Sequence, residues 1–457
     1  AVRVLEPADA CPRRGPFTGL DGDGLASACP KTVRNPRNHR KDHRQPAQTP
    51  ENWGRTKPSP QKTALLQRFL KELLDELSRT PVVLPFTPER MAFAADLSRA
   101  LAKRGRGRPE VQALAYWMRK AEVTRLAESF EALQSPTRRL MPRGTVFHMP
   151  PANVDTLFVY SWLLSLLTGN RNVVRLSERI AGTDNLILEV IRDVLVDHPD
   201  VAAATVMLTY GHDPEITAEI SARCDTRVIW GGDETVRSIR AVPLPVHATE
   251  LTFPDRFSLA AMSASAYRTL DDTQRDELAS RFYNDAYVFD QLACSSPRLL
   301  VWLGDPGADA QDFFDRVGKA AADRGYGVDA SSAIAKLAQA YEAMIDLPVT
   351  SYERDGTAVT VLGVEDFPHV RGAFCGAGFF FQMRVDSLLD LVPHITRADQ
   401  TLAVAGITLD EQRAFVDALA GRGIDRIVPI GRALDFNRVW DGFDLVAEFT
   451  RHVVVSG

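Results

Sequence analysis

The ten residues GNRNVVRLSE, at positions 169–178, decide the fold. A glycine ends an apolar helix expected over 154–167, and a short run rich in valine and leucine then predicts a strand over 172–176. Another helix is expected over 183–196, so the stretch belongs to a β-α-β pattern. Arg175 lies on this strand, and Ser177 and Glu178 follow its carboxyl end, where open α/β sheets bind ligands. A surface Arg–Glu pair would give the same local pattern.

The alternation of strands and helices continues outward from this stretch. Further strands are expected over 144–148, 204–210 and 226–230, with helices over 214–223 and from Gly232 onward. This spacing predicts a mostly parallel, doubly wound sheet of the Rossmann type, which commonly binds nucleotides. Helices precede it, over 65–77, from Thr87-Pro88 to Gly105, and over 109–133.

A second α/β region is expected from about residue 258. It is predicted to contain helices and strands, a hairpin that turns at Asp355-Gly356, and a helix opened by a capping box at Thr408. The other expected elements are helices over 272–286 and 310–324, a strand over 299–303, and strands near Phe379 and Leu402.

These patterns divide the chain into four parts. Residues 1–62 are rich in Pro, Arg, Gly, Asn and Asp and are expected to be a disordered tail. Residues 63–257 are expected to form a nucleotide-binding domain and residues 258–430 a catalytic domain. Residues 431–457 are expected to pack back on the fold.

Composition narrows the class of protein. The net charge of −5 on 457 residues gives no reason to expect a nucleic-acid partner. Five scattered cysteines without a Cys-x-x-Cys pair argue against a disulfide framework or a metal site and favour a reducing compartment. The longest apolar runs, such as 157–167, are too short to span a membrane, and no secretory signal opens the chain. We therefore expect a cytoplasmic protein.

Two short segments could bind charge near the carboxyl edge of the first sheet. Asn153 lies between a strand and an apolar helix, where it could cap the helix or donate its amide to an oxyanion. Gly231 and Gly232 form a strand-to-helix turn, where a helix N-terminus attracts phosphate. Asp233 and Glu234 argue against that role, since carboxylates there complement the helix dipole themselves.

Cys294 is the candidate nucleophile. It lies in the turn-like segment Ala293–Pro297, between a helix and a strand, where a thiol can be exposed and activated. A free cysteine more often packs as a small apolar residue, and Cys375 is a rival in a more apolar, glycine-flanked setting. A cysteine hydrolase or acyltransferase could pair Cys294 with a histidine such as His247.

In order and spacing these segments resemble the aldehyde dehydrogenase superfamily. The resemblance rests on residues 151–153, 169–178, 231–232 and 291–294. Within the superfamily, the chain looks most like the fatty acyl-CoA reductase family associated with bacterial bioluminescence. That likeness is carried by residues 167–170, 228–234, 293–297, 426–431 and 440–442, and it covers the chain from about Gln61 to its end.

The resemblance implies a function and a set of roles. Cys294 would form an acyl-enzyme with an acyl-CoA or acyl-carrier-protein thioester, and a nicotinamide would reduce it to the aldehyde. Asn153 would be an oxyanion donor. The cofactor, NADPH in preference to NADH, would contact Arg175, Ser177, Glu178, Gly231 and Gly232. Dimers are common in this superfamily, so a homo-oligomer is also expected.

The chain departs from the superfamily pattern in ways that keep alternatives open. Its cysteine motif is Gln-x-x-Cys in place of Gln-x-Cys, and the segment that grips the nicotinamide ribose has no clear counterpart. Glu250 could activate water in an aldehyde-oxidising enzyme of the same fold, or it could be structural. A non-catalytic scaffold is a third alternative.

Overall fold

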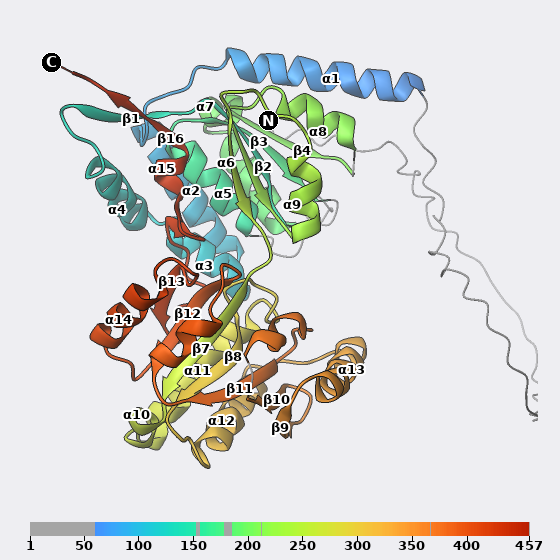
Figure 1. Ribbon diagram of the computed structural model, residues 1–457. Helices are drawn as coiled ribbons and strands as arrows, with labels where there is room; N and C mark the ends of the chain where they lie inside the picture. Colours follow the sequence, from blue (N-terminus) through green and yellow to red (C-terminus); the bar gives the residue numbers. More distant parts are fainter. Residues whose placement is uncertain (1–59, 152–155, 178–184, 212, 366, 457) are drawn as a thin grey trace, which may run out of the picture.

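The computed structural model describes residues 60–151, 156–177, 185–211, 213–365 and 367–456. In this part of the chain the two main sheets lie one above the other, each with helices on both faces (Figure 1). One has five strands and comes from residues 145–253, and the other has seven and comes from residues 257–429.

The five-stranded sheet is parallel throughout and has the order β4-β3-β2-β5-β6. Its strands are β2 (Thr145–Met149), β3 (Arg171–Leu176), β4 (Thr205–Thr209), β5 (Thr226–Trp230) and β6 (Thr249–Phe253). Adjacent residues of a strand point to opposite faces, so Val173 packs with one helical layer and Val174 with the other. Both faces are therefore apolar, as a parallel sheet requires.

Different helices cover the two faces of this sheet. On the Val173 side lie α1 (Pro60–Arg79), α8 (Pro214–Ser221) and α9 (Asp233–Arg240). On the Val174 side lie α2 (Pro88–Arg104), α3 (Pro109–Trp117), α5 (Leu157–Leu167), α6 (Leu186–Leu195) and the short α7 (Pro199–Ala203), with α4 (Lys120–Glu131) beside them. Every residue of α5 is buried, which explains its unbroken apolar sequence.

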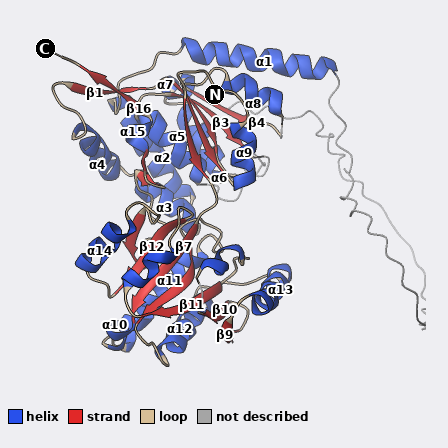
Figure 2. Cartoon of the chain, in the orientation of Figure 1, coloured by secondary structure: helices blue, strands red, loops and turns tan. Residues whose placement is uncertain are grey.

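The seven-stranded sheet has the order β13-β12-β7-β8-β11-β10-β9 and is parallel except for its edge strand β9. Its strands are β7 (Phe257–Ser263), β8 (Pro297–Leu303), β9 (Val349–Asp355), β10 (Val359–Val364), β11 (Phe379–Val385), β12 (Asp399–Ala405) and β13 (Arg426–Pro429). Figure 2 shows helices on either side of it. On one face lie α10 (Ala264–Arg268), α11 (Asp272–Tyr287) and α12 (Asp309–Asp323). On the other lie α13 (Ala330–Asp346), α14 (Leu409–Leu419) and the 3-10 helices η1 (Pro368–Gly372) and η2 (Leu388–His394).

The C-terminal residues return to the first sheet. Trp440, Leu445 and Phe449 join one buried cluster with Val146 and Tyr160. The segment contains β14 (Val439–Trp440), β15 (Phe443–Asp444), α15 (Leu445–Glu448) and β16 (Thr450–Val454), and β16 pairs with β1 (Arg138–Pro142). The four-part division of the chain stays a prediction, although the two sheets and this returning segment agree with it.

Most of the expected elements are present within a few residues of their predicted bounds. The helix expected over 109–133 is wrong, because the chain breaks at Met118-Arg119 and forms α3 and α4. Strands β6 and β7 and helix α13 were not predicted. The expected disordered tail falls almost entirely on residues 1–59, which lie outside the described residues. In the described part of the chain, no helix has the length and apolar character to cross a membrane.

Candidate active site

Cys294 lies in the segment that joins α11 to β8, between the two sheets. It is partly buried and lines a cavity of about 130 Å³. The carboxyl ends of β5 and β6 reach this cavity through Trp230 and Phe253, and Pro151 follows the end of β2. The other lining residues are Leu157, Gly231, Gly232, Pro254, Asp255, Arg256, Leu292, Arg298, Trp440 and Asp441.

The backbone around Cys294 is held by buried polar side chains. Asp290 and Gln291 have left-handed backbone angles, with φ of 53° and 60°. The Gln291 amide nitrogen donates to the carbonyls of Pro297 (3.0 Å) and Phe379 (2.9 Å), and its oxygen accepts from the Phe379 N–H (3.0 Å). The Ser258 hydroxyl donates to the Cys294 carbonyl at 2.7 Å. Gln291 therefore fastens this loop to the seven-stranded sheet, which gives the glutamine of the motif a structural role.

Opposing charges surround the thiol of Cys294. Burial raises its pKa to about 11, and the carboxylate of Asp441 acts in the same direction. A hydrogen bond from Gln400 and the positive charges of Arg298 and Arg426 lower the pKa. Since these three groups favour the thiolate, they would help Cys294 to react as a nucleophile.

Asp441 is fixed by two partners. Its carboxylate accepts a hydrogen bond from Arg256 Nε at 3.2 Å and another from the Gln400 amide. Burial raises the pKa of Asp441, while the neighbouring Arg256 lowers it. The ion pair with Arg256 holds the carboxylate in place and offsets part of its effect on Cys294.

The residues predicted to contact the cofactor lie at the carboxyl edge of the five-stranded sheet. Gly231 and Gly232 line the Cys294 cavity. Arg175, on β3, donates to the carbonyls of Tyr210 and Gly211, both at 3.4 Å, and its Nε is buried without a hydrogen-bond partner in the described part of the chain. Ser177 ends the described part of this segment. Glu178 and Asn153 lie outside the described residues.

Glu250 is not brought to the cavity. It lies near the amino end of β6, where its carboxylate pairs with Arg227 and, at 3.1 Å, with Arg240. The cavity is lined from the other end of the strand, at Phe253, about 10 Å along an extended chain. This ion-pair cluster agrees with the structural role that the sequence left open for Glu250.

Neither the second cysteine nor a histidine joins Cys294. Cys375 is absent from the described lining of the cavity, and so is every described histidine. His247 is exposed and pairs with Asp225 at 3.4 Å. His148 is buried, where it contacts Ser161 and Asn172, and burial lowers its pKa to about 4.

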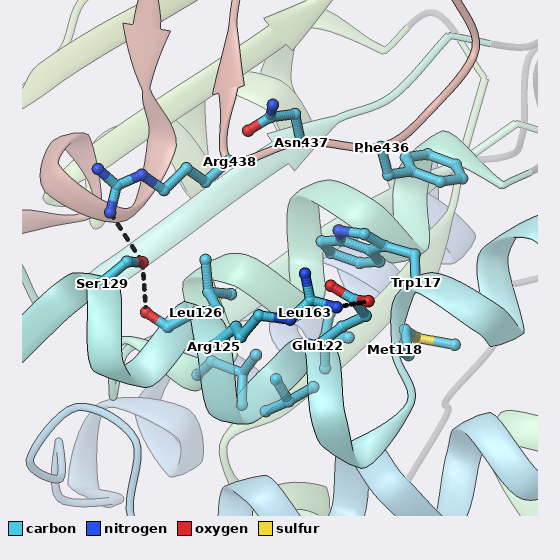
Figure 3. A pocket seen from close by; sticks show the side chains of 12 residues that line it. Trp117, Met118, Glu122, Arg125, Leu126, Ser129, Leu163, Phe436, Asn437 and Arg438 are labelled. Carbon is cyan, nitrogen blue, oxygen red and sulfur yellow. Dashed lines mark hydrogen bonds and ion pairs between the residues drawn. The ribbon is translucent and has the colours of Figure 1, made fainter. Parts of the chain in front are cut away.

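A second cavity, of about 280 Å³, lies between α3, α4, α5 and residues 436–438 (Figure 3). Trp117, Leu126, Leu163 and Phe436 form its apolar wall, and its polar rim includes Glu122, Arg125, Ser129 and Arg438. The ring of Tyr160 contacts Phe436, which lines this cavity, and Trp440, which lines the Cys294 cavity. This ring lies 5.3 Å from that of Phe436 and 5.6 Å from that of Trp440, measured between centroids. Aromatic side chains thus connect the two cavities.

A family model for acyl-CoA reductases (LuxC) matches residues 119–452. The chain belongs to this acyl-CoA reductase family. The match includes the Cys294 loop, the lining of the Cys294 cavity and the C-terminal segment that carries Trp440 and Asp441. It also includes the lining of the second cavity except Trp117 and Met118.

Two curated relatives show how far the sequence similarity of this chain extends. The long-chain acyl-protein thioester reductase of Aliivibrio fischeri is 28% identical over 169 residues, 36% of this chain and 33% of the relative. The enzyme of the same name from Vibrio harveyi is 22% identical over 309 residues, 64% of this chain and 60% of the relative. The chain therefore spans between one third and three fifths of the length of these relatives.

Solved structures show the fold of this reductase family member. Lactaldehyde dehydrogenase superimposes with a TM-score of 0.60 at 15% identity, covering 84% of this chain and 90% of that one. The glyceraldehyde-3-phosphate dehydrogenase GapN of Methanocaldococcus jannaschii, complexed with NADP, gives a TM-score of 0.60 at 12% identity, covering 86% and 95%. The expected aldehyde dehydrogenase-like α/β fold is confirmed.

Sequence reasoning missed several residues that the reductase fold places around Cys294. Arg256, Arg298, Gln400 and Asp441 come from segments up to 185 residues apart, as the Arg256–Asp441 pair shows. Only Asp441 lay in a motif already noted, Trp440-Asp441-Gly442, and the motif by itself gave it no role.

Proposed function

We propose that this protein reduces a fatty acyl thioester to the aldehyde through an acyl-enzyme on Cys294. The observation that carries the proposal is the position of Cys294, in a cavity that also contains Gly231 and Gly232 from the nucleotide-type sheet. One small cavity can therefore hold an acyl group on the thiol beside the reactive end of a dinucleotide.

The Cys294 thiolate attacks the thioester carbonyl, and the thiol of CoA or of a carrier protein leaves with a proton. Gln400, Arg298 and Arg426 favour the thiolate that this step needs. The tetrahedral species carries a negative oxygen, and we assign the Asn153 amide and the Cys294 backbone N–H as its hydrogen-bond donors. Removing the Asn153 amide by Asn153→Ala should lower turnover by about 10²–10³-fold.

The residues present fit a nicotinamide dinucleotide. Gly231 and Gly232 leave room at the end of β5, where an added Cβ on Gly232 would come within 3.1 Å of Asp255 Oδ2. The unpartnered Nε of Arg175 offers a donor at the end of β3. These residues, with Ser177 and Glu178, would hold the cofactor, which supplies hydride to the acyl group when it is bound.

The choice between NADPH and NADH rests on Arg175 and Glu178. Arg175 could form charge-assisted hydrogen bonds with a 2′-phosphate, whereas Glu178 could accept bonds from a free ribose diol. We propose NADPH. Arg175→Ala should then reduce the NADPH-to-NADH ratio of kcat/KM, and an unchanged ratio would contradict the assignment.

We assign the second cavity to the hydrocarbon chain of the substrate. An acyl group on Cys294 lies beside Trp440, and the aromatic contacts lead from there past Tyr160 to the apolar wall of Trp117, Leu163 and Phe436. The Tyr160 ring contacts both Trp440 and Phe436, so a long acyl chain that runs from one cavity to the other would have to displace this ring. Filling the cavity with Leu163→Trp should shift the preference toward shorter acyl chains.

The competing functions have less support from the same residues. An aldehyde-oxidising enzyme would need a base for water, and Glu250 is held by Arg227 and Arg240 away from the cavity. A cysteine hydrolase would need a histidine beside Cys294, and the cavity lining in the described part of the chain contains none. A homo-oligomeric state and a cytoplasmic location stay predictions.

The test is aldehyde formation from a panel of acyl-CoAs and acyl-carrier proteins with each reduced nicotinamide. We expect mass spectrometry to detect an acyl group on Cys294 before nicotinamide is added, and aldehyde to appear afterwards. Free fatty acid as the main product would contradict reduction and favour hydrolysis. Failure to bind either nicotinamide would exclude both dehydrogenase functions.

A further inference from the structure

Arg298 stands at an irregularity in the sheet next to Cys294. Along β7 and β8, Ser258 pairs with Pro297 and Leu259 pairs with Leu299, so two successive residues of β7 span three of β8. Arg298 is the extra residue, and the pairing of β8 with β11 begins only at Leu299. Such bulges redirect a side chain and are common beside active sites. Here the redirected side chain lines the Cys294 cavity.

The guanidinium of Arg298 is held without being neutralised. It stacks on the ring of Phe374, with 3.6 Å from Cζ to the ring centroid. Its Nε is buried without a hydrogen-bond partner, and no carboxylate in the described part of the chain forms an ion pair with it, although the charge of Asp255 raises its pKa. An aromatic face attracts a cation but leaves its charge and its N–H donors available. A partly buried cation in this condition favours an anion in the cavity.

The other charged groups that face the thiol are already occupied. Asp441 is paired with Arg256 and bonded to Gln400. The two terminal nitrogens of Arg426 donate to the carbonyls of Arg432 (2.8 Å), Ala433 (2.6 Å) and Asp435 (3.2 Å), and only its Nε lacks a partner in the described part of the chain.

Two further groups complete the surroundings of the thiol. Asp255 accepts a hydrogen bond from the Asp233 backbone N–H at 3.3 Å. The Tyr160 hydroxyl, behind the cavity, donates to the Asn437 carbonyl. Of the cations that act on Cys294 in the described part of the chain, Arg298 is therefore the one whose guanidinium forms neither a hydrogen bond nor an ion pair.

We propose that the Arg298 guanidinium stabilises the thiolate of Cys294 and, when that thiolate adds to the thioester carbonyl, the negative charge of the tetrahedral oxygen. The inference rests on the proposed function only in taking Cys294 as the reacting thiol. In the free protein the step is the loss of the thiol proton to water, which leaves an anion beside the guanidinium. Phe374 acts as a positioning residue for Arg298.

The test measures the alkylation of Cys294 by iodoacetamide as a function of pH, read as the mass of the modified peptide in the full-length protein. An opposite charge close by shifts a pKa by about 1–3 units. In Arg298→Leu we therefore expect alkylation at pH 7.5 to slow at least about tenfold and the pH profile to move upward. Arg298→Lys keeps the charge and should recover most of the rate.

Two controls separate this electrostatic role from a purely structural one. Phe374→Leu removes the stacking ring but keeps the cation, so the alkylation profile of Cys294 should move much less than in Arg298→Leu. The reactivity of Cys375, measured in the same samples, reports any general loosening of the 374–378 loop. If Arg298→Leu fails to fold, Arg298→Gln takes its place, since it also removes the charge and should shift the profile in the same direction.

The proposal is wrong if Arg298→Leu has the wild-type profile at Cys294, or if Phe374→Leu shifts the profile as far as Arg298→Leu does. Equal shifts in Arg298→Lys and Arg298→Leu would also overturn it. Because alkylation needs neither acyl thioester nor nicotinamide, its result stands apart from the aldehyde assay. If the wild-type protein forms no aldehyde while Arg298→Leu still shifts the alkylation profile, only the proposed function is contradicted.

Discussion

Two adjacent loops each present a partly buried cysteine, and their comparison shows how a fold distinguishes two similar thiols. Cys294 lies in the 290–296 loop and Cys375 in the 374–378 loop, and the Ala377 N–H donates to the Asp290 carbonyl between them at 3.2 Å. Burial raises the pKa of both thiols to about 11. The pKa values of the two thiols therefore do not distinguish Cys294 from Cys375.

The surroundings of the two thiols differ. Cys294 faces a cavity that is lined by Arg298 and by the carboxyl ends of β5 and β6. A hydrogen bond from Gln400 also lowers the pKa of its thiol. The cation that lowers the pKa of Cys375 is Lys336, which is itself bonded to backbone carbonyls. The comparison indicates that the 374–378 loop holds the 290–296 loop, and it supports our assignment of Cys294 as the reacting thiol.

The largest effect should come from removing one thiol or the other. Cys294→Ala should abolish both acyl-enzyme formation and aldehyde release, because no other described residue that lines the cavity can exchange with a thioester. Cys375→Ala is the matched control and should retain most of the activity. The measurement is the mass of acylated protein followed by aldehyde release on addition of NADPH. Acyl label on Cys375 in the wild-type protein would reverse the comparison.

Lys336 tests the support given by the 374–378 loop. Its Nζ donates to the carbonyls of Thr357 and Ala377, both at 2.7 Å. Lys336→Met keeps the apolar stem but leaves these acceptors without their donor, so the free energy of unfolding should fall by about 2 kcal/mol or more. Thermal unfolding measures this loss, and an unchanged Tm at every pH would contradict the assigned role.

The same variant should show a defined pH dependence. Burial lowers the pKa of Lys336 from 10.5 to about 8. Between these values the unfolded chain holds a proton that the folded chain has released, so the stability of the wild type rises with pH in this window. Methionine cannot titrate. The difference in Tm between wild type and Lys336→Met should therefore widen from pH 8 toward pH 10.5.

A smaller effect is expected where the two loops touch. Gly376 has a φ of 76°, and an added Cβ would lie 2.8 Å from the Asp290 carbonyl oxygen. Gly376→Ala should cost about 1–3 kcal/mol of stability, through backbone strain and this contact, and should slow acylation of Cys294. The control is Gly372→Ala, where an added Cβ meets nothing within 4 Å. Equal Tm values for the two variants would argue against a tight fit between the loops.

The smallest effect on activity is expected outside both loops, at Glu250. Glu250→Gln removes the charge that pairs with the buried Arg227, so the Tm should fall by a few degrees. Aldehyde formation per folded molecule should stay unchanged, because reduction needs no activated water. Product analysis provides the decisive measurement. Free fatty acid in the wild type that disappears in Glu250→Gln would mean that Cys294 serves an oxidising or hydrolytic enzyme.

Much of the fold followed from local pattern. Glycines and capping residues marked the ends of helices, as at Gly105 and Thr408, and short runs with valine, isoleucine or leucine marked strands such as β3 and β5. The missed elements have weaker patterns. Strands β6 and β7 follow each other after a few residues without an intervening helix, and α13 is rich in alanine and serine and buries few of its residues. Their positions are set by the sheets and helices they join.

The sequence by itself determined the parallel α/β architecture and the family of the chain, because both depend on residues close together in the sequence, and it singled out Cys294 as the candidate nucleophile. Only the tertiary structure decided what surrounds the thiol. Arg256, Gln400 and Asp441 come together because the fold brings separate segments of the chain to the Cys294 cavity. Arg298 lines the cavity because of the bulge in the pairing of β7 with β8. Glu250 is kept away because the pairing of β6 with β5 sets it beside Arg227, toward the opposite end of the strand. Local periodicity carries no information about such distant contacts, since they depend on strand order and register.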